Sequence, residues 1–436
     1  MFNRLILKHI LKSLVLVIIL CEYLISYSYA QELVLPENLV FRNHIYNSNI
    51  KSVQCYRFGF EQSTPVIDLN SNDQISLKFD NLKGLTEVYR VMFIHCSANW
   101  TPSPLDPFEY LDGFETDEIT NITSSYNTFH DYTHYQYNFP NDQIKFSRSG
   151  NYLLIVYEDN LDELILTQRI KIYTANTIIQ GNIGKPNIPK YAYFNQAIEL
   201  DVSLLNYTVS NPSDITLVIE QNNRWDKSIS NLKPSFVRNN VYSYRHQDNN
   251  HFPGGKEFRA IDLRNLNFKS ERIHDIVLDN PNKIILKVDE FRSFIHKMEW
   301  RDLNGQFAIS NNMQNSDTES EYNEVYFKLQ PGHNMEYPDA DIYLLGAINN
   351  WEISEEYKMR YNINSKMYEN TLLLKQGVYN YYYAYVSNQD SLVNTSLIEG
   401  DSKDTENDYH IYIYVKPLGE IHDELIGYSI LNSIKN

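Results

Sequence analysis

The stretch NYLLIVYEDNLDELILTQRIKIY, residues 151–173, contains two apolar runs on either side of a short polar turn at residues 160–163. Short runs rich in Ile, Leu, Val and Tyr that are bounded by turn residues are typical of neighbouring β-strands. We therefore predict that these residues form two strands, which close the first β-structured region of the chain.

The same kind of pattern recurs along most of the 436 residues. In QISLKFD (74–80) and VMFIHC (91–96), apolar side chains alternate with a period of two, which indicates strands. Helical periodicity of 3.6 residues is almost absent after residue 30. We predict an all-β protein built from tandem β-sandwich domains, immunoglobulin-like or early-set-like.

The first thirty residues are predicted to be a cleaved secretory signal peptide. Basic residues precede an apolar run at 14–20, and Ser28-Tyr29-Ala30 offers small residues at the positions that a signal peptidase reads. The apolar run is shorter than the roughly 20 residues of a membrane-spanning helix, so we expect no direct membrane insertion. A lipid anchor at Cys21 is the alternative interpretation.

Turns and polar runs divide the rest of the chain into three regions. We predict an N-terminal β-sandwich domain over residues 31–176, a middle β domain over 177–310, and a C-terminal early-set-like β-sandwich with a short tail over 324–436. The polar run NNMQNSDTESEYN, residues 311–323, has no apolar face to bury and is predicted to be a linker.

Composition and motifs exclude several classes of function. The formal net charge of −17 makes nucleic acid a poor partner, and three cysteines in 436 residues are too few for a disulfide scaffold. The chain contains no GxSxG, HExxH or CxxC motif, and its histidines lack metal-ligand spacing. We predict a non-enzymatic protein without a metal or cofactor.

Cys96 stands beside His95, but adjacent strand residues point to opposite faces. We predict that Cys96 shares a buried apolar face with Met92 and Ile94 as an inert thiol, and that His95 points outward to solvent or an interface. A disulfide between Cys55 and Cys96 is the alternative, because both lie on predicted strands of one exported domain.

The loop WTPSPLDPFEYLDGF, residues 100–114, contains three prolines, which restrict the backbone. Such a loop displays Trp100, Phe108, Tyr110 and Phe114 with little conformational entropy left to lose, as a protein-binding surface requires. The alternative is that these aromatic side chains fold back as a lid on their own sandwich.

The third region resembles the early-set β-sandwich of glycogen-binding modules. The matching residues are Gly346, Asn349, Asn350, Trp351, Leu374, Gly377, Tyr379 and Tyr381. Those modules stack the sugar on two tryptophans, but the chain reads SNQDSLVN (387–394) where the second is expected. The resemblance makes Trp351, Tyr379 and Tyr381 an alternative surface for sugar or a partner, and an exported carbohydrate-binding module the alternative function.

A longer resemblance covers most of the chain. Segments in the same order, among them HCSANWTPSPLDPFEYLDGF (95–114), FPGGKEFRAIDLR (252–264) and IEGDSKDTENDYHIYIY (398–414), look like plug proteins of the Bacteroidota type IX secretion system. Cys55 lies outside the common motif, which weakens the case for a disulfide. The resemblance implies a non-enzymatic periplasmic component at the inner face of the outer membrane. Such a component docks on the periplasmic opening of the large outer-membrane translocon barrel and seals it when idle.

Overall fold

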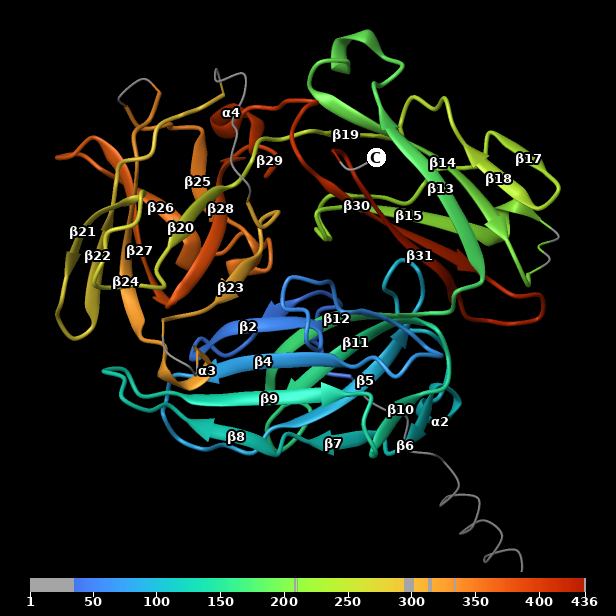
Figure 1. Ribbon diagram of the computed structural model, residues 1–436, viewed down its shortest axis with the longest axis horizontal. Helices are drawn as coiled ribbons and strands as arrows, with labels where there is room; N and C mark the ends of the chain where they lie inside the picture. The colour runs from blue at the N-terminus through green and yellow to red at the C-terminus, as the bar shows by residue number, and fades with distance from the viewer. Residues whose placement is uncertain are drawn as a thin grey trace, which may run out of the picture. The chain divides into compact units, whose positions relative to one another are not determined.

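The computed structural model describes residues 35–207, 209, 211–293, 302–312, 316–332 and 335–434. The predicted signal peptide at residues 1–30 lies outside the described residues. Two compact units, Met1–Leu39 and Val40–Asn436, make up the chain. In the first unit, the backbone N–H of Leu39 donates to the carbonyl oxygen of Pro36 in a turn (3.1 Å). All the sheets belong to the second unit (Figure 1).

The first β-sandwich has one sheet in the order β1-β12-β11-β5-β7, with β3 parallel to β12, and a facing sheet in the order β2-β4-β9-β8. A short β6–β10 pair lies beside them. The strands are β1 (His44–Ile45), β2 (Ile50–Arg57), β3 (Val66–Asp68), β4 (Ile75–Asn81), β5 (Arg90–Cys96), β6 (Leu111–Gly113), β7 (Thr116–Glu118), β8 (Asn121–Ser124), β9 (Thr133–Phe139), β10 (Ile144–Phe146), β11 (Gly150–Tyr157) and β12 (Leu164–Tyr173).

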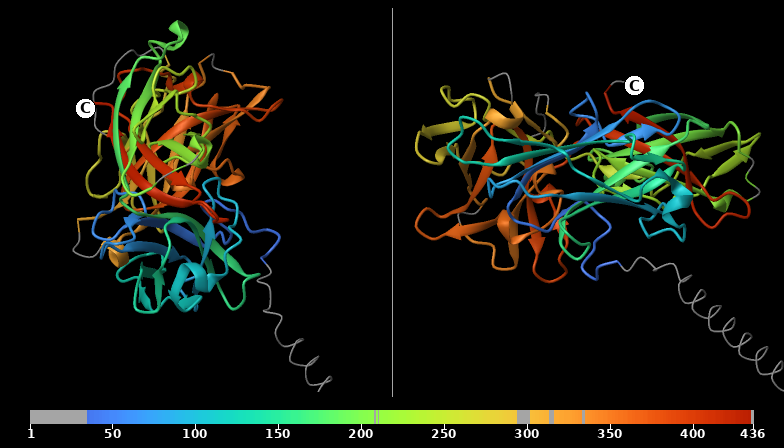
Figure 2. Two further views of the ribbon diagram at one scale, coloured as in Figure 1. Left: turned by 90° about the vertical axis from the view of Figure 1, so that its right-hand side faces the viewer. Right: turned by 90° about the horizontal axis from the view of Figure 1, so that it is seen from below.

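The second β-sandwich has one sheet in the order β13-β14-β18-β17, with β19 also pairing with β14, and a facing sheet in the order β16-β15-β30-β31. The strands are β13 (Thr177–Gly184), β14 (Asn195–Leu204), β15 (Ile215–Gln221), β16 (Ser228–Ile229), β17 (Phe236–Arg238), β18 (Val241–Tyr244), β19 (His251–Pro253), β30 (Asp408–Val415) and β31 (Glu424–Asn432). Figures 1 and 2 show the C-terminal β30–β31 hairpin, in red, beside the green strands of this sandwich.

The third β-sandwich is one sheet that folds over on itself in the order β20-β28-β25-β26-β27-β24-β22-β21. Strand β26 pairs with β25 on one side and β27 on the other, so that the two halves enclose one core. The strands are β20 (Arg259–Asp262), β21 (Ile273–Val277), β22 (Asn282–Leu286), β23 (Phe307–Ile309), β24 (Tyr322–Leu329), β25 (Ala340–Leu345), β26 (Lys358–Asn362), β27 (Met367–Lys375), β28 (Gly377–Ser387) and β29 (Val393–Asn394).

Only single-turn helices interrupt the strands in the described part of the chain. They are α2 (Pro107–Tyr110), α3 (Ser316–Glu319), α4 (Ser396–Glu399) and the 3₁₀ turns η1 (Pro189–Tyr191), η2 (Pro212–Asp214), η3 (Ala347–Asn349) and η4 (Glu355–Tyr357). The prediction of an all-β protein made of β-sandwiches is confirmed.

The sheets cross the boundaries predicted from the sequence. Strands β20 to β23 belong to the third sandwich, whereas the hairpin at residues 408–432 returns to the second, where β30 pairs with β15. The predicted linker at 311–323 contains α3 and the first residues of β24. Several of its described polar residues make contacts with the first sandwich: the Asp317 carboxylate, for example, pairs with Lys78 (2.8 Å).

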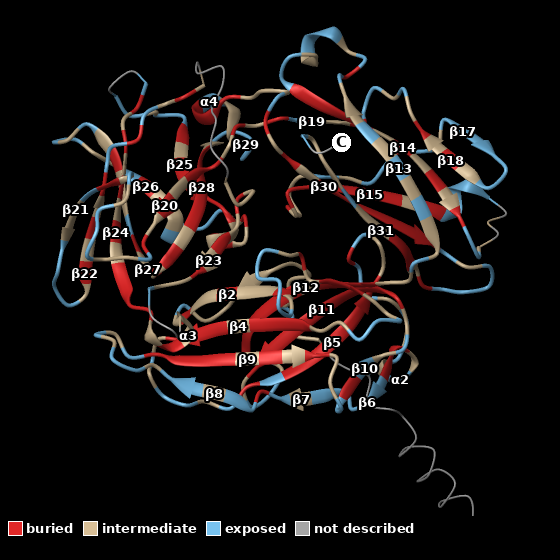
Figure 3. Ribbon diagram, in the orientation of Figure 1, coloured by how far each residue is buried: buried red, intermediate tan, exposed pale blue. Residues whose placement is uncertain are grey.

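Each sandwich has its own hydrophobic core, to which both of its sheets or sheet halves contribute side chains. The predicted pair of strands at 151–173 forms the antiparallel β11–β12 hairpin, and β11 is buried along its whole length. Figure 3 shows β5, β11 and β12 as mainly buried, in contrast to the exposed strands β6, β7 and β8. Strand β6 is part of the loop at 100–114 that the sequence singles out, and β7 follows that loop directly.

Candidate protein-interaction surface

The four aromatic side chains predicted to bind a partner divide into two buried and two exposed residues. Trp100 is 8% exposed and Tyr110 is 3% exposed, whereas Phe108 is 75% exposed and Phe114 is 63% exposed. The loop is therefore partly a lid on its own sandwich and partly a display, and only Phe108 and Phe114 are placed to meet a partner.

Trp100 and Tyr110 are held inside by specific contacts. The Trp100 ring lies against the Arg169 guanidinium, 4.3 Å from the ring centroid, and Lys171 Nζ is 5.4 Å away. The Tyr110 hydroxyl donates a hydrogen bond to the carbonyl oxygen of Phe93 (3.1 Å). Both rings are therefore packed within the protein and are not displayed to a partner.

Phe108 is displayed by α2, a single turn whose conformation is fixed locally. Pro107 occupies its first position, where a missing N–H costs nothing. The backbone N–H of Asp106 donates to the Glu109 carboxylate (2.9 Å), half of a capping box. These contacts restrict the backbone of α2 and so the direction in which Phe108 projects.

Phe114 follows β6, which pairs with β10. Gly113 has φ +113°, and a Cβ atom there would lie 2.1 Å from the carbonyl oxygen of Gln143, so only glycine permits this close approach. The close approach brings the same carbonyl oxygen within hydrogen-bonding distance of the next residue, and the Phe114 N–H donates to it (2.8 Å).

The segment from 106 to 118, which we call the acidic segment, contains six carboxylates and no basic residue. They are Asp106, Glu109, Asp112, Glu115, Asp117 and Glu118. None of them forms an ion pair with another described residue. Lys145 lies opposite Asp112 across β6–β10, and Arg90 lies opposite Glu118 across β5–β7, but neither closes such a pair. Arg148 Nε donates to the backbone carbonyl of Glu109 (3.0 Å). The surface therefore carries an excess of negative charge, and no described ion pair neutralises its six carboxylates.

A pocket of about 460 Å³ lies beside β10. Its lining includes the apolar side chains of Ile67, Leu69, Phe146 and Ile172. The charged residues in the lining are Asp68, Asp73, Asp142 and Lys145. Because β10 also pairs with β6, this pocket adjoins the acidic segment.

His95 and Cys96 point to opposite faces of β5 as predicted, but the faces are the reverse of those expected. His95 is fully buried inside the first sandwich: its Nε2 lies 3.3 Å from the carbonyl oxygen of Ser149, and its Nδ1 lies 2.9 Å from Ser103 Oγ. Burial lowers the pKa of His95 to about 4, so it is neutral. Cys96 is buried on the outer face, where burial raises its thiol pKa to about 12.

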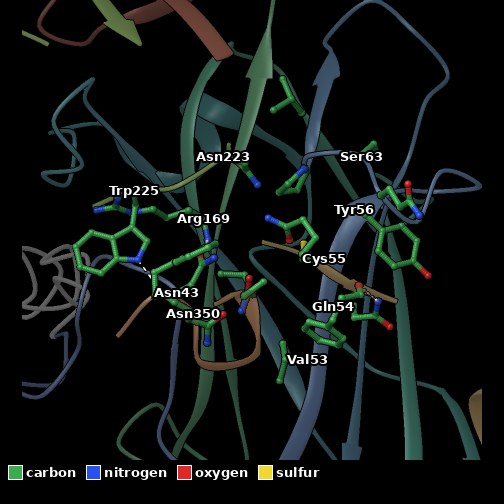
Figure 4. A pocket seen from close by; sticks show the side chains of 18 of the residues that line it. Asn43, Val53, Gln54, Cys55, Tyr56, Ser63, Arg169, Asn223, Trp225 and Asn350 are labelled. Carbon is green, nitrogen blue, oxygen red and sulfur yellow. Dashed lines mark hydrogen bonds between the residues drawn. The ribbon is translucent and has the colours of Figure 1, made fainter. Parts of the chain in front are cut away.

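The predicted alternative of a Cys55–Cys96 disulfide is not formed, and both thiols are free. Cys96 lies on the outer face of its sheet and so points away from the facing sheet that contains β2. Cys55 lines a pocket of about 90 Å³ at the junction of the three sandwiches. Figure 4 shows it on one wall with Gln54, while Arg169 and Trp225 lie on the other. Trp225 Nε1 donates to the backbone carbonyl of residue 350 across this junction (2.8 Å).

The alternative sugar or partner surface is buried. Trp351, Tyr379 and Tyr381 are 6%, 3% and 0% exposed. Trp351 packs against the Arg224 guanidinium, 4.0 Å from the ring centroid, and the Tyr381 hydroxyl donates to Asp289 inside the third core (2.8 Å). The tyrosine stripe is therefore core packing, and none of the three rings offers a face to a sugar.

A buried polar cluster that the sequence did not predict joins the first and third sandwiches. Lys375 Nζ lies 2.6 Å from the Asp80 carboxylate, and each side chain is 1% exposed. The same carboxylate accepts from the Tyr322 hydroxyl (2.7 Å) and bonds to His134 Nδ1 (2.6 Å). These residues are more than 50 positions apart in sequence, so no local pattern signals the cluster.

A second buried contact joins the first and second sandwiches. Lys171 on β12 pairs with Glu220 on β15 (3.1 Å), and the Tyr414 hydroxyl on β30 donates to Asn151 Oδ1 on β11 (2.7 Å). The outer face of the β5–β11–β12 sheet is therefore covered by the second sandwich, which explains why both faces of β5 are apolar.

Across the described residues, no group of three or more His, Cys, Asp or Glu side chains is placed to hold a metal ion. No helix in the described part of the chain has the length and apolar character needed to cross a membrane.

Comparison with known proteins identifies the family. A family model described as "Type 9 secretion system plug protein 1st domain" matches residues 50–174. A solved structure of a hypothetical protein from Parabacteroides merdae is 31% identical with a TM-score of 0.86, over 90% of this chain and 100% of that chain. Dimeric latent PorU from Porphyromonas gingivalis is 10% identical over 88% of this chain and 34% of that one, and its TM-score of 0.16 supports no structural argument. No curated protein matches the chain. The chain belongs to the family of type 9 secretion system plug proteins.

Proposed function

We propose that the protein docks on the periplasmic opening of the large outer-membrane translocon barrel and closes it when no cargo is passing. Membership of the plug family supports a role in this secretion system. The observation that carries the docking proposal is the fixed display of Phe108 and Phe114 on the acidic segment. Because their backbone is already restricted, these aromatic side chains have less entropy to lose on binding, which suits them as interface anchors.

The proposed mode of action is protein contact without chemistry. His95 and Cys96, the sequence neighbours that most resemble a catalytic pair, project to opposite faces of β5 and are both buried. A seal must bind firmly and yet release, which favours an interface of standard size, on the order of 1,200–2,000 Å². We place the protein in the periplasm, at the inner face of the outer membrane.

A pull-down from the native organism tests this proposal. Tagged wild-type protein should retain the translocon barrel, and cells that lack the protein should admit large antibiotics through an open barrel. The Phe108→Ala/Phe114→Ala variant should fold normally by circular dichroism but lose the barrel and fail to restore the permeability barrier. Retention of the protein on α-glucan without any barrel subunit would instead support the carbohydrate-binding alternative.

A further inference from the structure

We infer that the acidic segment and the pocket beside β10 bind a basic segment of the partner, in which an apolar side chain is flanked by Lys or Arg. This inference deepens the proposed function, because it names the chemistry of the partner surface that this face takes. It rests on three features of the first sandwich: exposed apolar side chains, unneutralised charge and a fixed backbone.

The apolar component is the pair of phenylalanines together with the pocket. Phe108 and Phe114 leave 75% and 63% of their surface in solvent, although the surrounding strands β6 and β7 are otherwise polar. The pocket of about 460 Å³ adjoins them through β10, and its lining includes the partly exposed side chains of Leu69 and Phe146. A partner side chain of aliphatic or aromatic character would gain buried area in this pocket.

The negative charge of this face determines which charge a partner segment should carry. Six carboxylates occupy thirteen consecutive positions, and three more aspartates line the pocket. Of these three aspartates, Asp73 lies 3.6 Å from Arg57, which is outside the pocket lining. Lys145 is the one basic residue in the lining. Charges of one sign that are concentrated without local partners attract an oppositely charged surface and repel a similar one. An acidic partner segment is therefore disfavoured, and a basic one is favoured.

The backbone holds these groups in place before any partner arrives. Strand β6 pairs with β10, and β7 pairs with β5. The Asp117 carboxylate accepts hydrogen bonds from the Tyr137 hydroxyl (2.9 Å) and from Asn141 Nδ2 (3.0 Å), which ties β7 to the turn beside the pocket. Binding therefore requires little ordering of this face, and the complementary charges add to the rate and specificity of association.

Two charge variants of the full chain with the same change in net charge test the inference. The first, Asp112→Asn/Glu115→Gln/Glu118→Gln, removes exposed carboxylates of the acidic segment. The matched control removes three exposed carboxylates elsewhere, by the substitutions Asp248→Asn, Glu271→Gln and Glu336→Gln. Both variants are first checked for native circular dichroism and thermal unfolding.

A second pair of variants tests the aromatic component. Phe108→Ala/Phe114→Ala is compared with Phe236→Ala/Phe268→Ala, which removes two phenylalanines that are 61% and 69% exposed elsewhere on the chain. This comparison separates a specific anchor from a general loss of exposed apolar surface.

Binding is measured against two probes. The first is the purified translocon barrel complex in detergent, at about 50 and 300 mM NaCl. We expect the wild-type chain and both control variants to bind with the same affinity and to weaken about tenfold or more at the higher salt concentration. The acidic-segment variant should bind about tenfold more weakly at low salt and lose most of the salt dependence. The Phe108→Ala/Phe114→Ala variant should bind about thirtyfold more weakly while keeping that dependence.

The second probe is a fluorescein-labelled peptide, RLRFRLR, with ELEFELE as its charge-reversed counterpart. The basic peptide should bind the wild-type chain at least about tenfold more tightly than the acidic-segment variant, and the acidic peptide should not bind. If the wild-type chain ignores the barrel but binds the basic peptide in this way, the proposed function fails and the inference stands. If the acidic-segment variant and its control behave alike toward the peptide, or if barrel binding is independent of salt, the inference is wrong.

Discussion

The buried ion pair between Lys375 and Asp80 predicts a large and specific loss of stability on Lys375→Met. The substitution replaces a side chain that is 1% exposed with one of similar length, so packing changes little while the positive charge disappears. The ammonium also donates to the backbone carbonyl of Asp317 (2.6 Å) and lies over the Tyr132 ring, 4.1 Å from its centroid. The contact therefore links β27 of the third sandwich to β4 of the first.

The size of the stability loss follows from the buried Asp80 charge that Lys375→Met leaves without its partner. Removing one partner of a buried pair costs about 3–5 kcal/mol, because the other charge stays buried and uncompensated. The Asp80 carboxylate keeps its bonds to Tyr322 and His134, so we expect the lower end of that range, about 3 kcal/mol. Burial raises the pKa of Asp80, but Lys375 and His134 outweigh it and hold that pKa below its usual value. Their contribution is present at pH 7 and is lost on acidification through the lowered pKa.

The free energy of unfolding in guanidinium chloride at pH 7 provides the measurement. The double variant Asp80→Asn/Lys375→Met should lose about 2 kcal/mol less than the sum of the two single variants, since it leaves no unpaired charge. Arg360→Met is the control, because Arg360 pairs with Glu355 at side-chain exposures of 69% and 67% and should contribute under about 1 kcal/mol. A loss of less than about 1 kcal/mol for Lys375→Met would refute the view that this pair is buried and joins two sandwiches.

Three further predictions follow from other buried or strained residues. Because burial lowers the pKa of His95 to about 4, the unfolded chain binds a proton there between about pH 6.5 and 4 that the folded chain does not. Stability should therefore fall by up to about 3 kcal/mol as the pH drops through that window, and a His95→Gln variant that shows the same fall would contradict this assignment. Maleimide should label the partly exposed Cys55 before the buried Cys96, and it should label both slowly, because burial raises the pKa of each thiol. Rapid labelling of Cys96 in the folded protein would count against its burial. Gly113→Ala should lower the free energy of unfolding by about 2–3 kcal/mol more than Gly59→Ala, because both positions have positive φ but a Cβ atom meets a backbone oxygen only at Gly113. Equal losses of stability in thermal or denaturant unfolding would exclude the steric explanation.

Strand patterns predicted the fold well where the pattern is local. The hairpin at 151–173 and the opposite directions of His95 and Cys96 both follow from the period of two. The assignment of the faces failed because the strand VMFIHC is apolar on both, and the second sandwich covers the face that would otherwise meet solvent. Only the tertiary contact between β11 and β30 decides which face is the inner one.

Domain boundaries could not be obtained from the sequence for the same reason. The pairing of β15 with β30 joins residues about 200 positions apart, and no local feature marks it. Described residues of the predicted linker at 311–323 make contacts with the first sandwich, such as the hydrogen bond from the Tyr132 hydroxyl to the backbone carbonyl of Ser320 (2.9 Å). A polar run of this kind is therefore compatible with an interface between two sandwiches as well as with a solvent-exposed linker.

The sequence predicted the loop of the candidate site but not which of its aromatic side chains are exposed. Proline spacing and aromatic content predicted the loop, but they could not separate Trp100 and Tyr110, which find partners in the first sandwich, from Phe108 and Phe114, which do not. The charge of the acidic segment is plain in the sequence. Only the structure shows that its carboxylates lack ion pairs, although Arg90, Lys145 and Arg148 lie nearby.

A cryo-EM map of the native translocon complex tests the central proposal most directly. We predict that the chain lies across the periplasmic opening of the barrel with the acidic segment against it, so that Phe108 and Phe114 become buried beside Lys or Arg side chains of the partner. A map in which the chain is bound to the barrel while residues 106–118 face open solvent would contradict the proposed docking surface. A map without the chain at the opening of an idle barrel would contradict the proposed function itself.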